Sequence, residues 1–188
     1  MAVRPLFGGT LSCAIPDGFA DVSAFRQVPD NQEVFANAHT DQCIIIELLQ
    51  FESGVANEES GQYFFNEIAH SNGCSPADVR VLEKRIIPRE EGPSINAECV
   101  SSVVVGDQHV AKFKEGENAK NVVRVYLGNI RLPHVTTDVV ISVSVPMQIN
   151  PASSSSECSQ LTNSAEVGAQ VFQTVHRSFQ VHDWTLFG

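Results

Sequence analysis

Two carboxylates, Asp30 and Glu33, stand three residues apart at a predicted corner of the chain. Pro29 presets φ for a turn, and the side chains of Asp30 and Asn31 stabilise turns by hydrogen-bonding to their own backbone. Gln32 and Glu33 then lead into an apolar run. The pattern predicts that both carboxylates project from a rigid surface corner, where lysines or arginines of a partner protein could pair with them. A turn with no further function explains the same pattern.

A pair of carboxylates can also act as a general acid and a general base. That chemistry requires a desolvated pocket that moves the two pKa values apart. An exposed turn supplies neither desolvation nor a pocket, so the sequence does not favour catalysis by Asp30 and Glu33.

Other motifs of catalysis and cofactor binding are missing from the sequence. The chain has no GxxxxGK[ST] phosphate-binding loop and no GxSxG nucleophile context. Its histidines and cysteines show neither the HExxH spacing nor a zinc-finger spacing. We therefore expect no catalytic residue, no metal and no cofactor. A hydrolase or transferase with a cryptic site stays open as an alternative that no motif supports.

The 188 residues are 43% hydrophobic and 18% charged, a composition typical of a globular protein. At this length we expect a single domain that spans residues 1–188. No apolar run approaches the ~20 residues of a membrane span, and the first residues include no apolar segment of signal-peptide length. The five cysteines are widely spaced, which favours reduced thiols in cytosol or nucleus. We expect a monomer without membrane insertion.

The net charge of −10 is unevenly distributed along the chain. Residues 1–60 contain nine acidic and two basic side chains, whereas residues 61–134 contain nine of each sign. An acidic surface repels the phosphates of nucleic acids and steers toward a basic protein surface. We therefore expect a protein partner and no nucleic acid. The alternative, which stays open, is that the acidic residues serve only to keep the protein soluble.

Hydrophobic periodicity predicts many strands and few helices. Strands are predicted at residues 9–15, 33–37, 43–51, 79–87, 99–105, 108–113, 121–132 and 137–145. Gly106 and Asp107 separate two of these runs and predict a hairpin turn. A helix is predicted at residues 62–70. Runs of adjacent strands with interspersed helices predict an α+β fold, in which helices flank a central, mostly antiparallel sheet of about six or seven strands.

The C-terminal third contains a second predicted helix. Asn163 and Glu166 predict its N-terminal cap, after a flexible connection at residues 151–159. An apolar stripe on this helix is formed by Val167, Val171, Val175 and Phe179. The bulky tail residues Trp184 and Phe187 are expected to dock onto the body of the protein.

Two polar residues outside the corner raise further expectations. Asp21 is expected to cap a short helix at residues 22–26. Arg131 lies in the predicted strand 121–132, which is mostly apolar and also contains Arg124. Arg131 predicts either a contact with a partner, or a structural role in a salt bridge or at a sheet edge with its stem packed on the sheet.

Several segments resemble, in order and over nearly the whole chain, the Mog family of Ran-binding guanine nucleotide release factors. They are RPLFGG at 4–9, IPDGFADVS at 15–23, VPDNQEVF at 28–35, DQCIIIELL at 41–49, IRLP at 130–133, TDVVISV at 137–143, HD at 182–183 and LFG at 186–188. The match is weakest between residues 72 and 108.

The resemblance implies an α/β/α sandwich of the kind also found in the photosystem protein PsbP. It implies binding to the small GTPase Ran and release of its guanine nucleotide, GTP in particular, in nucleocytoplasmic transport, with the protein in nucleus and cytoplasm. The family's acidic contact residues fall on Asp30 and Glu33, with Asn31 and Gln32 between them. A non-catalytic adaptor of the same fold that binds another protein is the alternative.

Overall fold

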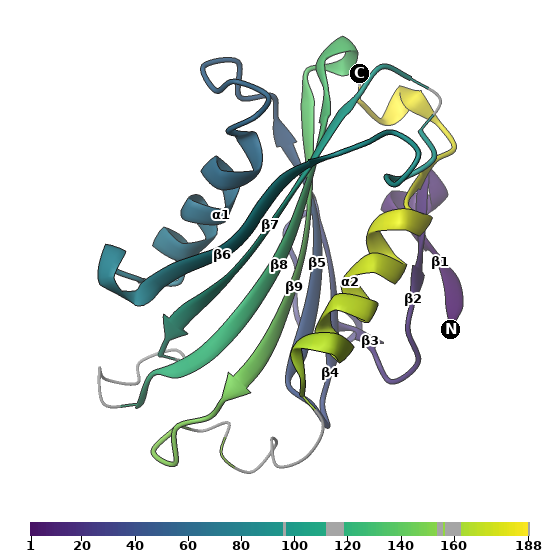
Figure 1. The fold of residues 1–188 in the computed structure, drawn as a ribbon. Helices are drawn as coiled ribbons and strands as arrows, with labels where there is room; N and C mark the ends of the chain where they lie inside the picture. The colour runs from purple at the N-terminus through teal and green to yellow at the C-terminus, as the bar shows by residue number, and fades with distance from the viewer. Residues whose placement is uncertain (96, 112–118, 154–155, 157–162, 188) are drawn as a thin grey trace.

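The computed structural model describes residues 1–95, 97–111, 119–153, 156 and 163–187 (Figure 1). Its larger sheet has seven strands, and every pair of neighbouring strands is antiparallel. In spatial order these strands are β3 (Ala20–Asp21), β4 (Gln32–Asn37), β5 (Gln42–Gln50), β9 (Thr137–Gln148), β8 (Asn121–Leu132), β7 (Val100–Val110) and β6 (Val79–Ile87). The predicted antiparallel sheet is therefore confirmed.

A second, three-stranded sheet was not predicted. It consists of β1 (Ala2–Leu6), β2 (Leu11–Ile15) and β10 (Gln180–Val181), with β2 in the middle. All five residues of β2 are buried, and its sequence has the apolar character of a strand. Strand β1 is exposed over its first four residues, so its sequence shows no comparable apolar pattern. This small sheet joins the first and last parts of the described chain.

Two α-helices flank the large sheet, one on each face (Figure 1). Helix α1 (Ser60–Ser71) packs on β6, β7 and β8. Helix α2 (Ala165–Ser178) packs on β8 and β9 and also on β2 of the small sheet. The layers confirm the predicted α+β sandwich. Within the described residues, no helix is both long and apolar enough to cross a membrane.

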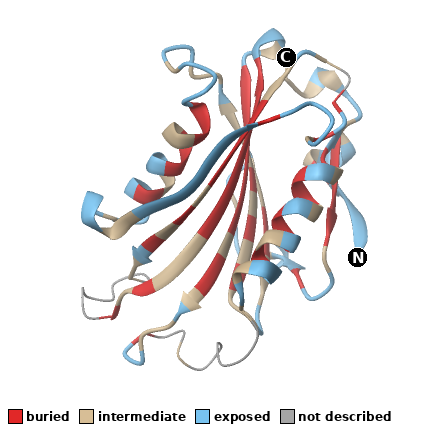
Figure 2. Cartoon of the chain, viewed as in Figure 1, coloured by how far each residue is buried: buried red, intermediate tan, exposed pale blue. Residues whose placement is uncertain are grey.

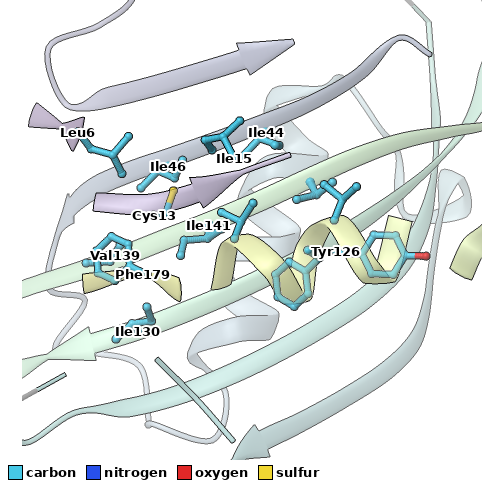
Figure 3. Close-up of a cluster of buried hydrophobic side chains, with 14 of the residues drawn as sticks. Leu6, Cys13, Ile15, Ile44, Ile46, Tyr126, Ile130, Val139, Ile141 and Phe179 are labelled. Atoms are coloured by element: carbon cyan, nitrogen blue, oxygen red, sulfur yellow. The ribbon is translucent and has the colours of Figure 1, made fainter. Parts of the chain in front are cut away.

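The hydrophobic core is divided by the large sheet. Figure 3 shows Val139 and Ile141 of β9 in the cluster on the α2 side. Alternation along β9 adds Val143 to the same cluster and places Val140 in the cluster under α1. The larger cluster fills the space between the sheet, α2 and the small sheet, and Figure 2 shows the buried residues concentrated on these inner faces. Phe65, which is fully buried, is central to the cluster under α1.

The predicted hairpin at Gly106 and Asp107 is wrong. Strand β7 runs through both residues, and Gly106 pairs with Val125 while Asp107 pairs with Arg124. Glycine is needed here for space, because a Cβ on Gly106 would lie 2.5 Å from Cζ of Phe65. Residues 112–113 of the second predicted strand lie outside the described residues.

The cap of α2 also differs from the prediction. Ser164 is the N-cap, and its Oγ accepts a hydrogen bond of 3.1 Å from the backbone N–H of Val167. Asn163 instead links two other segments, since its Oδ1 accepts from Gln42 and its Nδ2 donates to the carbonyl of Thr40. Most of the predicted connection at 151–159 lies outside the described residues.

The stripe on α2 is confirmed except at its first position. Val171, Val175 and Phe179 are buried, whereas Val167 is exposed. The tail docks as predicted, because Trp184 and Phe187 pack against the main core cluster.

Arg131 is an internal structural residue. Its side chain is 1% exposed, and its Nε lies 3.1 Å from Oδ1 of the buried Asp138. The guanidinium also donates to the backbone carbonyls of Glu52 and Val55, and it lies over the ring of Phe51. The salt-bridge interpretation is confirmed, and this burial leaves no surface for a partner contact.

Candidate functional site

The predicted corner is a turn that is fixed to the neighbouring strand. The backbone N–H of Gln32 donates to the carbonyl of Pro29 at 2.9 Å. Asn31 is bonded twice to Leu48 of β5: its carbonyl accepts from the Leu48 N–H at 3.0 Å, and its Nδ2 donates to the Leu48 carbonyl at 3.2 Å. Asn31 therefore anchors the turn, and its side-chain amide is used within the molecule.

Asp30 lies at the tip of this turn and is exposed. Among the residues that the structure describes, no lysine or arginine forms an ion pair with it. Its carboxylate is therefore presented to solvent from a backbone that is held in place. This position agrees with the prediction.

Glu33 occupies a different position. Its Oε1 accepts a hydrogen bond of 2.6 Å from the backbone N–H of Phe7, and the residue is half-buried. The charge of Glu33, after the larger effect of burial, helps raise the pKa of the Cys13 thiol to about 12. Glu33 thus reaches from β4 toward the small sheet, and the prediction that both carboxylates project together from the corner is wrong for Glu33.

The strand register explains this difference. Glu33 is the second residue of β4, and alternation places it on the same face as the buried Phe35. Gln32 faces the opposite way, and its Nε2 donates to Oε1 of Glu47 on β5 at 2.5 Å. Glu47 is a further carboxylate beside the corner that sequence reasoning missed. Only the pairing of β4 with β5 reveals it.

The loop before the corner is also ordered by hydrogen bonds. The carboxylate of Asp21 accepts from the backbone N–H of Ser23 at 2.8 Å and caps the 3-10 helix Val22–Ala24. The cap agrees with the prediction, and the helix is shorter than the predicted 22–26. Phe25 follows this helix and is 81% exposed. Sequence analysis did not single out Phe25, although an aromatic residue amid polar neighbours was a visible signal.

The corner is exposed from Pro29 to Asn31. A cavity of about 360 Å³ lies elsewhere, between the opposite edge strand β6 and α2. His176 lines that cavity, and burial, followed by the charges of Arg177 and Arg85, lowers its pKa to about 4. No cluster of three or more metal-binding side chains occurs within the described ranges. The exposed turn is suited to docking against a protein surface.

Comparison with known proteins identifies the family. Residues 4–146 match the family described as Ran-interacting Mog1 protein. The chain belongs to the Mog1 family. A Mog1 relative from Danio rerio, named Ran guanine nucleotide release factor, is 41% identical over 98% of this chain and 99% of its own length. Another, nuclear import protein mog1 of Schizosaccharomyces pombe, is 33% identical over 97% of this chain and 98% of its own length.

Solved structures agree with this Mog1 assignment. The crystal structure of the Saccharomyces cerevisiae Ran-binding protein Mog1p is similar with a TM-score of 0.75 and 26% identity, covering 100% of this chain and 98% of that one. Cyanobacterial PsbP from Synechocystis shares the fold, with a TM-score of 0.54 at 11% identity over 96% of this chain and 91% of its own. The predicted likeness to both is confirmed.

Proposed function

We propose that this protein binds the GTPase Ran and promotes release of its guanine nucleotide, GTP in particular, in nucleocytoplasmic transport. Membership of the Mog1 family and the names of its relatives support this function. In this proposal the protein acts as a monomer in nucleus and cytoplasm, as a regulator without catalytic residues or a cofactor of its own. The observation that carries it is the exposed Asp30 carboxylate on a doubly anchored turn.

Asp30 is the principal Ran contact in this proposal. Gln32 and Glu33 follow it on opposite faces of β4, and Asn31 fixes the turn through its two hydrogen bonds to Leu48. The surrounding carboxylates give this edge of the sheet a negative potential. Such a potential speeds encounter with a basic partner surface and is screened by salt.

Nucleotide release requires a preference between two states of the GTPase. A factor that bound the nucleotide-loaded and nucleotide-free states equally would shift nothing. By linkage, nucleotide must weaken binding of the factor by the same ratio as the factor weakens binding of nucleotide. Asp30 can supply this preference by pairing with a basic group of Ran that otherwise supports the nucleotide, or by opposing the phosphates through its own charge.

The proposal is tested by measuring the affinity for nucleotide-free Ran over a range of salt concentrations. We expect Asp30→Ala to weaken binding by about 1–3 kcal/mol and to reduce the salt dependence. Glu67→Ala, which removes an exposed carboxylate from α1, is the matched control and should bind like wild type. Wild-type protein that fails to bind Ran would refute the proposal.

A further inference from the structure

Phe25 is unusually exposed for an aromatic side chain. At 81%, it is the most exposed large hydrophobic residue in the described part of the chain. Met1 and Val3, the next most exposed, lie at the start of the chain. Ile86 on the edge strand β6 is 41% exposed, about half as much as Phe25. Burying a Phe side chain removes apolar surface from water and stabilises the buried state, and this chain leaves that contribution unused.

The exposure of Phe25 does not arise from a loose backbone. Its N–H donates to the carbonyl of Val22 at 2.9 Å, and the N–H of Arg26 donates to the same carbonyl at 3.1 Å. The Asp21 cap fixes the start of the same turn. Three hydrogen bonds therefore fix the backbone that carries Phe25, so binding its side chain would mainly cost the entropy of its two side-chain torsions.

Phe25 belongs to the same surface segment as Asp30. Residues 22–31 connect β3 to β4, and these two strands pair antiparallel through Ala20 with Ala36 and Asp21 with Phe35. The connection thus leaves and returns to one edge of the large sheet (Figure 1). Phe25 lies in sequence between the carboxylates of Asp21, at the end of β3, and Asp30, and the exposed Arg26 follows it directly.

We propose that Phe25 is the apolar anchor of the Ran-binding surface and enters an apolar pocket of Ran that is bordered by basic side chains. The inference rests on the proposed function, because it assigns a second contact to the surface that contains Asp30. Interfaces concentrate binding energy in a few buried aromatic or arginine side chains, and charged groups surround these anchors. An outward Phe25 that is flanked in sequence by Asp21, Arg26 and Asp30 has this composition.

The two contacts have different physical signatures. Asp30 acts over a distance, so its loss slows association and reduces the salt dependence. Phe25 acts only at contact, so its loss accelerates dissociation and leaves the salt dependence unchanged. Kinetic measurement can therefore separate an apolar anchor from a general weakening of the surface.

The test measures association and dissociation rates of nucleotide-free Ran with wild type, Phe25→Ala, Phe25→Leu and Ile86→Ala. We expect Phe25→Ala to weaken binding roughly tenfold or more, mainly through faster dissociation. Phe25→Leu keeps an apolar side chain and should recover part of the affinity. Ile86→Ala removes an exposed apolar side chain from the opposite edge of the sheet and should bind like wild type.

Thermal unfolding of each variant accompanies the binding data. Because Phe25 is exposed, its replacement should leave the melting temperature unchanged. Phe25→Ala with wild-type affinity, while Asp30→Ala is weakened, would overturn the anchor and leave the proposed function standing. Equal losses for Phe25→Ala and Ile86→Ala would also overturn it. If wild type itself does not bind Ran, the proposed function fails first.

Discussion

The carboxylate of Glu33 is hydrogen-bonded to the backbone of Phe7, with 2.6 Å between Oε1 and the amide nitrogen. This bond connects β4 of the large sheet to the turn that links β1 and β2 of the small sheet. Phe7 has a φ of +48°, in the left-handed region that non-glycine residues rarely adopt. Glu33 therefore helps hold a strained turn, which Asp30 does not.

This relationship predicts different effects for two substitutions of Glu33. Glu33→Ala removes the acceptor for the Phe7 N–H and should lower the free energy of unfolding by about 1–3 kcal/mol. Glu33→Gln keeps an acceptor oxygen and should lose less. Both variants remove the charge, so both should weaken Ran binding. Chemical denaturation and a binding assay on the same samples measure the two effects. Equal stability of wild type and Glu33→Ala would show that the bond to Phe7 contributes nothing.

The buried pair of Arg131 and Asp138 predicts a strong dependence of each residue on the other. Arg131→Met leaves the fully buried Asp138 without its cation, and should cost about 3–5 kcal/mol of stability. The double variant Arg131→Met, Asp138→Leu removes both charges and should cost less than the two single variants together. Urea denaturation of wild type, Arg131→Met, Asp138→Leu and the double variant measures the coupling between the two residues. Additive losses would contradict an interaction between the two residues.

His176 predicts a loss of stability in mild acid. Its pKa is lowered to about 4 in the folded protein, because the ring is buried and the charges of Arg177 and Arg85 are nearby. In the unfolded chain the pKa is about 6.5. The unfolded state therefore binds more protons between these two values, and stability contributed by neutral His176 is present above pH 6.5 and lost as the pH falls toward 4.

The effect should be about 2 kcal/mol between pH 7 and pH 5. His176→Gln cannot take up this proton, so its stability should change less over the same interval. His39→Gln, at an exposed position, is the control and should retain the wild-type pH dependence. Urea denaturation of each protein at pH 7 and at pH 5 measures the change in the free energy of unfolding. The same pH dependence in wild type and His176→Gln would refute the assignment to this histidine.

Local patterns predicted most of the fold, because alternation and turn residues act over a few positions. Strands β8 and β9 could be read in this way, as could the exposed turn at Asp30. Gly106 was misread because a Gly-Asp pair is typical of a hairpin turn. Its real role is to leave room for Phe65, a contact between distant segments. That the 188 residues unfold as one domain stays a prediction.

The exposed turn at Asp30 was predicted and the orientation of its neighbours was not, while the binding of Ran by these residues stays a prediction. Asp30 depends on local turn chemistry, which the sequence contains. The orientation of Glu33 depends on the pairing of β4 with β5 and on the position of Phe7, 26 residues away. The contribution of Glu47 depends on its pairing with Gln32 across the same two strands. Information of this kind lies in the register of the sheet and not in any single segment.

The most direct test of the account is the rate at which Ran releases a fluorescent guanine nucleotide. We predict that wild-type protein accelerates this release, that Glu67→Ala accelerates it equally, and that Asp30→Ala at the same sub-saturating concentration loses roughly tenfold or more of the acceleration. Asp30→Ala that accelerates release as well as wild type does would contradict the account.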